Sequence, residues 1–178
     1  MPDHTLPTLQ TERLVLRPWA LADFDEYFAM WQDPAVAHFI TGEPLSREDC
    51  WRRMLGSVGQ WHLMGFGFFV VREKSSGSFV GAAGFHEMRR ALTPSIEGTL
   101  EAGWALASAH HGKGYAREAM RAAIGWALQA FPTHEITCII NPENHASLRL
   151  AEALGFARET VATYKNEPTV IFRMGQVG

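Results

Sequence analysis

The stretch from His110 to Ala119 places two glycines and a lysine just before an amphipathic helix. Its apolar residues recur at alternating intervals of three and four until Phe131-Pro132, where a helix should end. A helix start has backbone N–H groups without partners and partial positive charge, and preceding glycines let an anion approach closely. The segment therefore predicts a phosphate site.

A Gly-Lys-Gly turn before a helix is, by itself, more often an ordinary loop than a ligand site. This turn matches neither common nucleotide fingerprint, because no Ser or Thr follows Gly112-Lys113 and no third glycine completes a Rossmann turn. What distinguishes it is the preceding segment, 101–107, which is predicted to be a strand running directly into the turn.

Composition limits the class of protein. The chain has 178 residues, 47% of them apolar, which suits a single domain, expected over 8–176, with one core. The net charge of −3 and the lack of a basic run argue against nucleic-acid binding. Cys50 and Cys138 have no metal-ligand spacing and are expected to be buried thiols. No signal or membrane-spanning pattern is present, so a soluble cytoplasmic protein is expected.

The rest of the chain predicts alternating strands and helices. Strands are expected at 12–17, 66–72, 79–85, 101–107, 135–140, 158–164 and 169–174. Helices are expected at 24–31, from Ser46, at 116–130 and from Asn144. Ser46 followed by Asp49 is typical of a capped helix start, and the apolar stripe of that helix is expected to be Trp51, Leu55 and Val58.

Three separated motifs, in this order, resemble those of the GNAT superfamily of acetyl-CoA N-acetyltransferases. They are the strand 101–107 with the turn 111–116, the pair Asn144 and Ser147, and Leu154-Gly155-Phe156. The opening segment 11–17 is similar to the branch that includes ribosomal-protein N-terminal alanine acetyltransferases, and the resemblance spans 9–174. It implies an α+β fold: a single mixed, largely antiparallel sheet of about six to seven strands, flanked by about four helices, with a splayed strand pair holding the cofactor.

The resemblance implies acetyl-CoA as co-substrate, with its diphosphate on the backbone of the turn. Gly114 and Ala116 fill the small positions of the family pattern, whereas His111 replaces the usual Gln or Arg. In the family a bulge splays the preceding strand, whose main chain pairs with the pantetheine arm. The implied cofactor-binding residues are Trp104, Ala105, Leu106, His111, Gly112, Lys113, Gly114, Tyr115, Ala116, Arg117, Asn144 and Ser147.

Asn144 and Ser147 have two interpretations: a capped helix start, or the family's contacts near the sulfur of coenzyme A. Many family members have a tyrosine seven residues after this asparagine that protonates the thiolate, but here the position is Ala151. Ser147 is therefore the candidate acid. Tyr164 is a weaker substitute, because a tyrosine near a strand end more often packs.

A carboxylate acting through water could deprotonate the amine, and Glu101 and Glu87 are the candidates. A lone glutamate is usually a solvated surface charge, although Glu101 gains from its place on the motif-bearing strand. His86, His110 and His111 could also carry a proton, the last two being turn residues first. A backbone N–H near Leu106 is expected to meet the oxyanion.

Two functions stay open from the sequence. One is an N-acetyltransferase acting on a primary amine, either a protein N-terminus or a small molecule. The other is a non-catalytic acyl-CoA-binding or sensing domain, which Ala151 keeps open. Trp31 and Trp51 are expected in the core, Trp61 at the rim of an acceptor pocket, and a homodimer is possible by analogy with the family.

Overall fold

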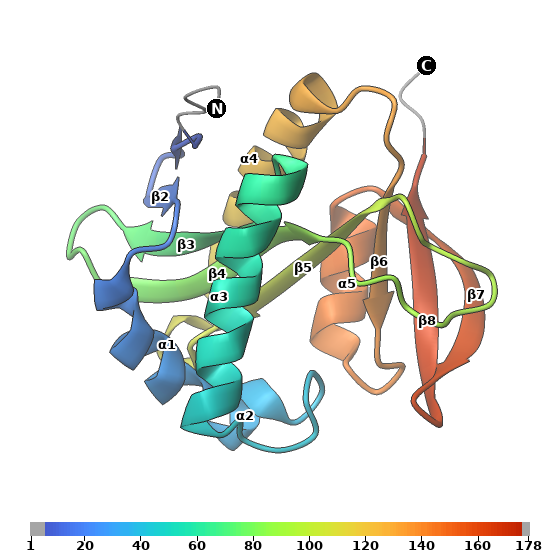
Figure 1. Ribbon diagram of the computed structural model, residues 1–178, viewed down its shortest axis with the longest axis horizontal. Helices are drawn as coiled ribbons and strands as arrows, with labels where there is room; N and C mark the ends of the chain where they lie inside the picture. Colours follow the sequence, from blue (N-terminus) through green and yellow to red (C-terminus); the bar gives the residue numbers. More distant parts are fainter. Residues whose placement is uncertain (1–5, 176–178) are drawn as a thin grey trace.

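The computed structural model describes residues 6–175 as one eight-stranded sheet with helices on both faces (Figure 1). The strands are β1 (Leu9–Gln10), β2 (Leu14–Arg17), β3 (Phe68–Glu73), β4 (Phe79–His86), β5 (Leu100–Leu106), β6 (Ile136–Ile140), β7 (Phe156–Tyr164) and β8 (Glu167–Met174). The α-helices are α1 (Phe24–Trp31), α2 (Pro34–Ala37), α3 (Arg47–Met64), α4 (Tyr115–Ala130) and α5 (His145–Ala153). The α+β class expected from the sequence is confirmed, with β1 and α2 as short additions.

The sheet has the order β1-β2-β3-β4-β5-β6-β8-β7 and consists of two antiparallel blocks. β5 and β6 join them as the parallel pair, and their register covers only Leu100↔Ile136 and Glu101↔Thr137. Beyond Glu101, β5 continues to pair with β4 but no longer with β6. The two blocks therefore separate toward the end of β5, and this is the splayed strand pair that the family resemblance implies.

The splay does not come from a bulge in β5. The β4–β5 register runs without a shift from Gly81↔Leu106 to His86↔Glu101. The register shifts lie elsewhere, between β3 and β4 and between β7 and β8. Loss of pairing with β6, rather than an extra residue on the β4 side, opens the gap.

Each face of the sheet has its own apolar layer. One contains Phe69, Val71 and Val80 packed with the apolar stripe of α4, including Ala119, Met120 and Ala123. The other contains Val70, Phe79 and Ala105 packed with residues of α1, α2 and α3. Because strand side chains alternate between faces, this assigns α4 to one side and α1 and α3 to the other (Figure 1).

The long β4–β5 loop crosses the block of the sheet formed by β6, β8 and β7 (Figure 1). Leu92 and Ile96 of this loop are buried against Ala162 of β7 and Ile171 of β8. The loop is thereby fixed over the same face as α3, close to the point where β5 and β6 part.

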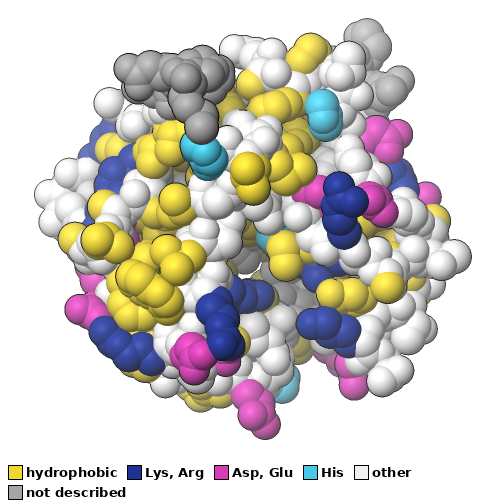
Figure 2. Space-filling view, in the orientation of Figure 1, with side chains coloured by type: hydrophobic (Ala, Val, Ile, Leu, Met, Phe, Trp, Pro, Cys, Tyr) yellow, Lys and Arg dark blue, Asp and Glu magenta, His cyan; other side chains and the backbone are white. Residues whose placement is uncertain are grey.

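The buried stripe of α3 is not the expected one. Trp51, Leu55 and Val58 are 38%, 46% and 42% exposed, and apolar side chains lie among polar ones on the face shown in Figure 2. The helix buries Cys50, Met54 and Trp61 instead. Both stripes have helical spacing, so periodicity alone could not decide which one faces the sheet.

Two tryptophans and the two cysteines test further expectations from the sequence. Trp31 is buried as predicted, but Trp61 is also buried, packed against Phe69 and Trp126, so its assignment to a pocket rim is wrong. Cys50 and Cys138 are buried free thiols, as expected. Among residues 6–175, none of the helices combines the length and apolar character that a membrane crossing requires.

Candidate active site

The start of α4 presents a row of open backbone donors. Gly112 and Gly114 have φ of +72° and +78°, in the left-handed region that glycine adopts most easily. Gly114 is the N-cap and has no side-chain cap. Six consecutive N–H groups, from 112 to 117, donate no hydrogen bond within residues 6–175. With the positive end of the helix dipole added, this is a site suited to a phosphate group.

A carboxylate at this helix start is kept from repelling an anion. Glu118, in the first turn, accepts hydrogen bonds from the hydroxyl of Thr11 and from the backbone and side chain of Arg13. Burial alone would raise the pKa of Glu118, but these bonds and the Arg13 charge hold it below its ordinary value. The Arg13 guanidinium also donates to the carbonyl of Lys113 at 2.9 Å. Thr11 and Arg13 therefore hold the turn before α4 in place through their hydrogen bonds to Glu118 and Lys113.

The free edge of β5 lies just before this turn. The N–H of Ala107 bonds to Val80 of β4, and the N–H of Leu100 bonds to Glu135, just before β6. Because backbone groups alternate along a strand, the N–H and C=O groups of Trp104 and Leu106 face the gap, whereas those of Ala105 face β4. Trp104 and Leu106, expected to pair with the pantetheine arm, have the required backbone direction. The backbone groups of Ala105, also expected among the cofactor-binding residues, are turned to β4.

The start of α5 lies on the other side of the gap between β5 and β6, next to the block formed by β6, β8 and β7. Asn144 caps the helix, its side chain accepting from the N–H of Ser147 at 3.1 Å. The indole N–H of Trp104 donates to Ser147 Oγ at 3.2 Å, so a side chain of β5 reaches α5 across the opening. An indole N–H can only donate, so the hydroxyl proton of Ser147 is free to be donated elsewhere. Ala151 is fully buried.

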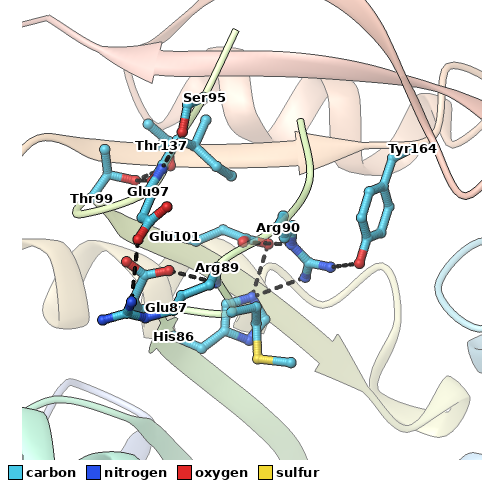
Figure 3. Close-up of polar contacts among 12 residues, drawn as sticks. His86, Glu87, Arg89, Arg90, Ser95, Glu97, Thr99, Glu101, Thr137 and Tyr164 are labelled. Carbon is cyan, nitrogen blue, oxygen red and sulfur yellow. Dashed lines mark hydrogen bonds and ion pairs between the residues drawn. The ribbon is translucent and has the colours of Figure 1, made fainter. Parts of the chain in front are cut away.

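A buried polar cluster lies on the α3 face of the sheet, opposite the face on which Trp104 contacts Ser147. It is at the point where β5 and β6 part (Figure 3). Glu101 accepts from His86 Nε2 at 2.9 Å and from Arg90 Nε at 2.7 Å, and Arg90 also donates to the Tyr164 hydroxyl at 2.9 Å. Burial alone would raise the pKa of Glu101, but His86 and Arg90 hold it below its ordinary value. Glu101 is thus an ionised, enclosed carboxylate, and each of its two oxygens is held by a neighbouring side chain.

Glu87 has a different environment. Its two carboxylate oxygens accept the N–H groups of Arg89 and Gly98, each at 2.7 Å. The side chain of Gln60 holds its backbone from α3. Glu87 therefore ties together the two ends of the β4–β5 loop (Figure 3), and its position favours a structural role over proton transfer.

The other residues of the turn stabilise it or surround it. His111 Nε2 donates to the carbonyl of Leu106 at 2.8 Å, fixing the turn to the end of β5. His110 packs against Tyr115, and burial, followed by the nearby Lys113 charge, lowers its pKa. Tyr115 is buried and donates to Glu73, whereas Lys113 and Arg117 are exposed. Two positive side chains therefore stand beside the open donors.

Sequence reasoning did not find Arg13 or Arg90. Arg13 lies 105 residues from Glu118, and Arg90 lies 74 residues from Tyr164, so no local pattern joins either pair. The adjacent arginines after His86-Glu87 were the one available signal for the second pair. Within residues 6–175, no group of three His, Cys, Asp or Glu side chains is placed to hold a metal ion.

Comparison with known proteins agrees with this geometry. The acetyltransferase (GNAT) domain family matches residues 13–157, which include the turn, the free edge of β5 and the start of α5. The chain belongs to the GNAT acetyltransferase family. It is therefore an acyltransferase, and acetyl-CoA is the co-substrate of its family.

Relatives of this GNAT protein match over most of their length. An uncharacterized N-acetyltransferase of Bacillus licheniformis is 30% identical over 86% of this chain and 84% of its own. The ribosomal protein uS5-alanine N-acetyltransferase of Escherichia coli (strain K12) is 31% identical over 86% of this chain and 80% of its own. A GNAT-family acetyltransferase structure from Bordetella pertussis has a TM-score of 0.85 and 32% identity, covering 95% and 99% of the two chains.

Proposed function

We propose that this GNAT enzyme transfers the acetyl group of acetyl-CoA directly to a primary amine within a ternary complex. The observation that carries the proposal is the row of six N–H groups at the start of α4 that have no partner within residues 6–175, next to the free edge of β5. Those donors suit the diphosphate of coenzyme A, and the strand edge suits its amide-containing pantetheine arm. The exposed Lys113 and Arg117 add positive charge around the diphosphate.

Direct transfer is favoured over an acyl-enzyme. The cysteines of the chain, Cys50 and Cys138, are 0% and 1% exposed, and burial raises the pKa of both thiols. A buried, protonated thiol is a poor nucleophile that a thioester cannot reach. In the proposed reaction the amine nitrogen attacks the thioester carbon, the C–S bond breaks, and coenzyme A leaves as a thiolate.

The splay supplies groups for both developing charges. The N–H of Trp104, close to Leu106 on the same strand, faces the gap, and we assign it to the oxyanion of the tetrahedral intermediate. Ser147 is assigned to the leaving thiolate, because its oxygen accepts from Trp104 and its own proton is free. Ala151 provides no proton, so the acid comes from the first turn of α5 rather than from its second.

The acceptor is a protein N-terminus or a small-molecule amine. A relative that acetylates ribosomal-protein alanine supports the first, and the proposal includes both because no motif in the sequence fixes the chemistry of the acceptor. We also propose a cytoplasmic location, where a reducing environment suits two free thiols.

The test is a panel assay with acetyl-CoA and three kinds of amine: alanyl and seryl peptides, lysine-containing peptides, and small monoamines and polyamines. Thiol release and product mass are measured together. The proposal predicts thiol release matched by a gain of one acetyl group on at least one acceptor. Stabilisation by acetyl-CoA in a melting assay, with no thiol release above background across the panel, would instead identify the non-catalytic binding domain.

A further inference from the structure

His86 stands at the point where the sheet opens. It pairs in register with Glu101, the last residue of β5 that is paired with β6. Cross-strand partners share a face, and Glu101 shares its face with Gly103 and Ala105. Ala105 packs with residues of α1 and α3. His86 therefore lies on the α3 face, opposite the face on which Trp104 meets Ser147.

The two sides of the opening are chemically different. On the α4 and α5 side lie the open donors and the Ser147 hydroxyl that we assign to coenzyme A. On the α3 side lie the rings of Phe68 and His86, whose centroids are 5.2 Å apart, with Phe68 directly over Gly103. This face is hollowed near its middle (Figure 2). An amine reaching the thioester from the α3 side would therefore meet His86 near the vertex of the splay.

The shorter of two contacts at His86 Nε2, 2.9 Å to Glu101 against 3.5 Å to Arg90, decides its tautomer. Glu101 is ionised and can only accept, so His86 Nε2 carries the proton that it donates to Glu101 Oε1. The neutral ring then has its lone pair on Nδ1. That atom has no hydrogen-bond partner among residues 6–175, and it is not one of their buried unpaired atoms. The His86 side chain is 23% exposed, against 6% for Glu101.

We propose that His86 Nδ1 accepts the proton that the acceptor amine loses as its nitrogen bonds to the thioester carbon. This inference rests on the proposed function and names the base of that reaction. The nitrogen gives one proton to His86, the C–S bond electrons leave with sulfur, and the thiolate gains one proton from the Ser147 hydroxyl as that hydroxyl takes one from water. Solvent then takes the proton from His86, so one amine N–H is exchanged for one S–H.

Glu101 is a positioning residue in this scheme, because it acts through His86. Its carboxylate orients the ring and stabilises the imidazolium that forms. Arg90 Nε holds the other carboxylate oxygen, and Arg90 is itself held by Tyr164. The charged groups facing His86 are thus Glu101 at 2.9 Å and the Arg90 guanidinium at 3.5 Å, which act in opposite directions on a positive ring.

The test compares His86→Gln with the wild type on the fastest amine of the panel. Glutamine retains an amide N–H for Glu101 but cannot take a proton. We expect kcat to fall about 100-fold with coenzyme A affinity unchanged, and the acidic limb of the pH profile to disappear. Arg89→Gln, at an exposed position of the same loop, is the matched control and should retain wild-type kcat.

Glu101→Gln supplies the readout for positioning. Loss of the carboxylate charge disfavours the imidazolium, so the acidic limb should move to lower pH while kcat falls. A His86→Gln enzyme within twofold of wild type, with the same acidic limb, would overturn the assignment. Absence of turnover in the wild type would refute the proposed function instead.

A direct measurement covers the case in which His86→Gln fails to fold. Nitrogen-15 NMR of the imidazole in the wild-type protein distinguishes the two neutral tautomers. The assignment requires the proton on Nε2 at neutral and alkaline pH. A ring protonated on Nδ1 would overturn it, because that nitrogen could not then accept a proton.

Discussion

Two helices begin at the opening of the sheet, and their first turns differ. At the start of α4, the N–H groups from 112 to 117 have no partner within the described residues. At the start of α5, the N–H groups of His145, Ser147 and Leu148 all donate to Glu143 or Asn144, and only that of Ala146 is left. Helix starts are normally capped by a side chain. The α4 start has no such cap, and residues 111–114 before it are exposed and accessible to a ligand.

The difference separates a ligand site from a structural helix start. Asn144 satisfies α5 locally, which leaves the Ser147 hydroxyl as its chemical contribution. The α4 start has no capping side chain, and Arg13 offsets the one carboxylate in its first turn. An anion supplied by a ligand would satisfy the α4 start, whereas the α5 start has only the N–H of Ala146 without a partner among the described residues.

The largest effect is expected for Gly114→Pro. Proline fixes φ near −65°, whereas Gly114 has +78°, and one of the open N–H groups is lost. A hydrogen bond to a charged group contributes about 1.5–3 kcal/mol, and the turn is displaced as well, so affinity for coenzyme A should fall by more than about 100-fold. Isothermal titration measures this, and an unchanged dissociation constant would refute the α4 site.

Ser147→Ala tests whether α5 contributes a side chain rather than its backbone. The cap bond uses the N–H of Ser147 and survives the substitution. We expect kcat to fall about 100-fold with little change in coenzyme A affinity. Ser147→Thr retains the hydroxyl and is the control that should recover most of the rate. Equal rates for the alanine variant and the wild type would remove Ser147 from the mechanism.

Ala116→Pro and Ala146→Pro form a matched pair at the second position of each helix. Each removes one unpaired N–H from a first turn, where proline is tolerated, and any proline strain is common to both. Only the α4 variant should weaken binding of coenzyme A, by about 10- to 100-fold. If titration shows similar losses of coenzyme A affinity in both variants, the proposed difference between the two helix starts is wrong.

Asn144→Ala should act on stability instead. Loss of an N-cap side chain costs about 1 kcal/mol of unfolding free energy, while the α4 donors stay intact. Asn144→Asp should restore the cap. Urea denaturation measures the stability, and a large loss of coenzyme A affinity in the alanine variant would assign a ligand role to this residue as well.

The smallest effect is expected for the hydrogen bonds that Thr11 and Arg13 make to Glu118 at the start of α4. The pKa of Glu118 is lowered in the folded protein, so its contribution is present above the unfolded value of about 4.5 and is lost as the pH falls through the folded value. Glu118→Gln should therefore be less stable than wild type by about 1 kcal/mol or less at pH 7. The two melting temperatures should converge under acid conditions; a difference that persists there would exclude this origin.

The α4 start could be predicted from sequence because all its signals are local: a strand, two glycines and a periodic helix within 30 residues. The start of α5 was predicted for the same reason, through Asn144. The buried face of α3 was not, because Cys50, Met54 and Trp61 have the same periodicity as the exposed stripe. Arg13 and Arg90 act on residues far away in the sequence, and only the folded sheet brings them together.

The most direct test of the α4 site is the structure of the complex with coenzyme A. We predict that the diphosphate oxygens lie within hydrogen-bonding distance of several N–H groups between Gly112 and Arg117, with the pantetheine arm along Trp104 and Leu106. A diphosphate bound at the start of α5, or anywhere that leaves residues 112–117 without ligand contacts, would contradict the account.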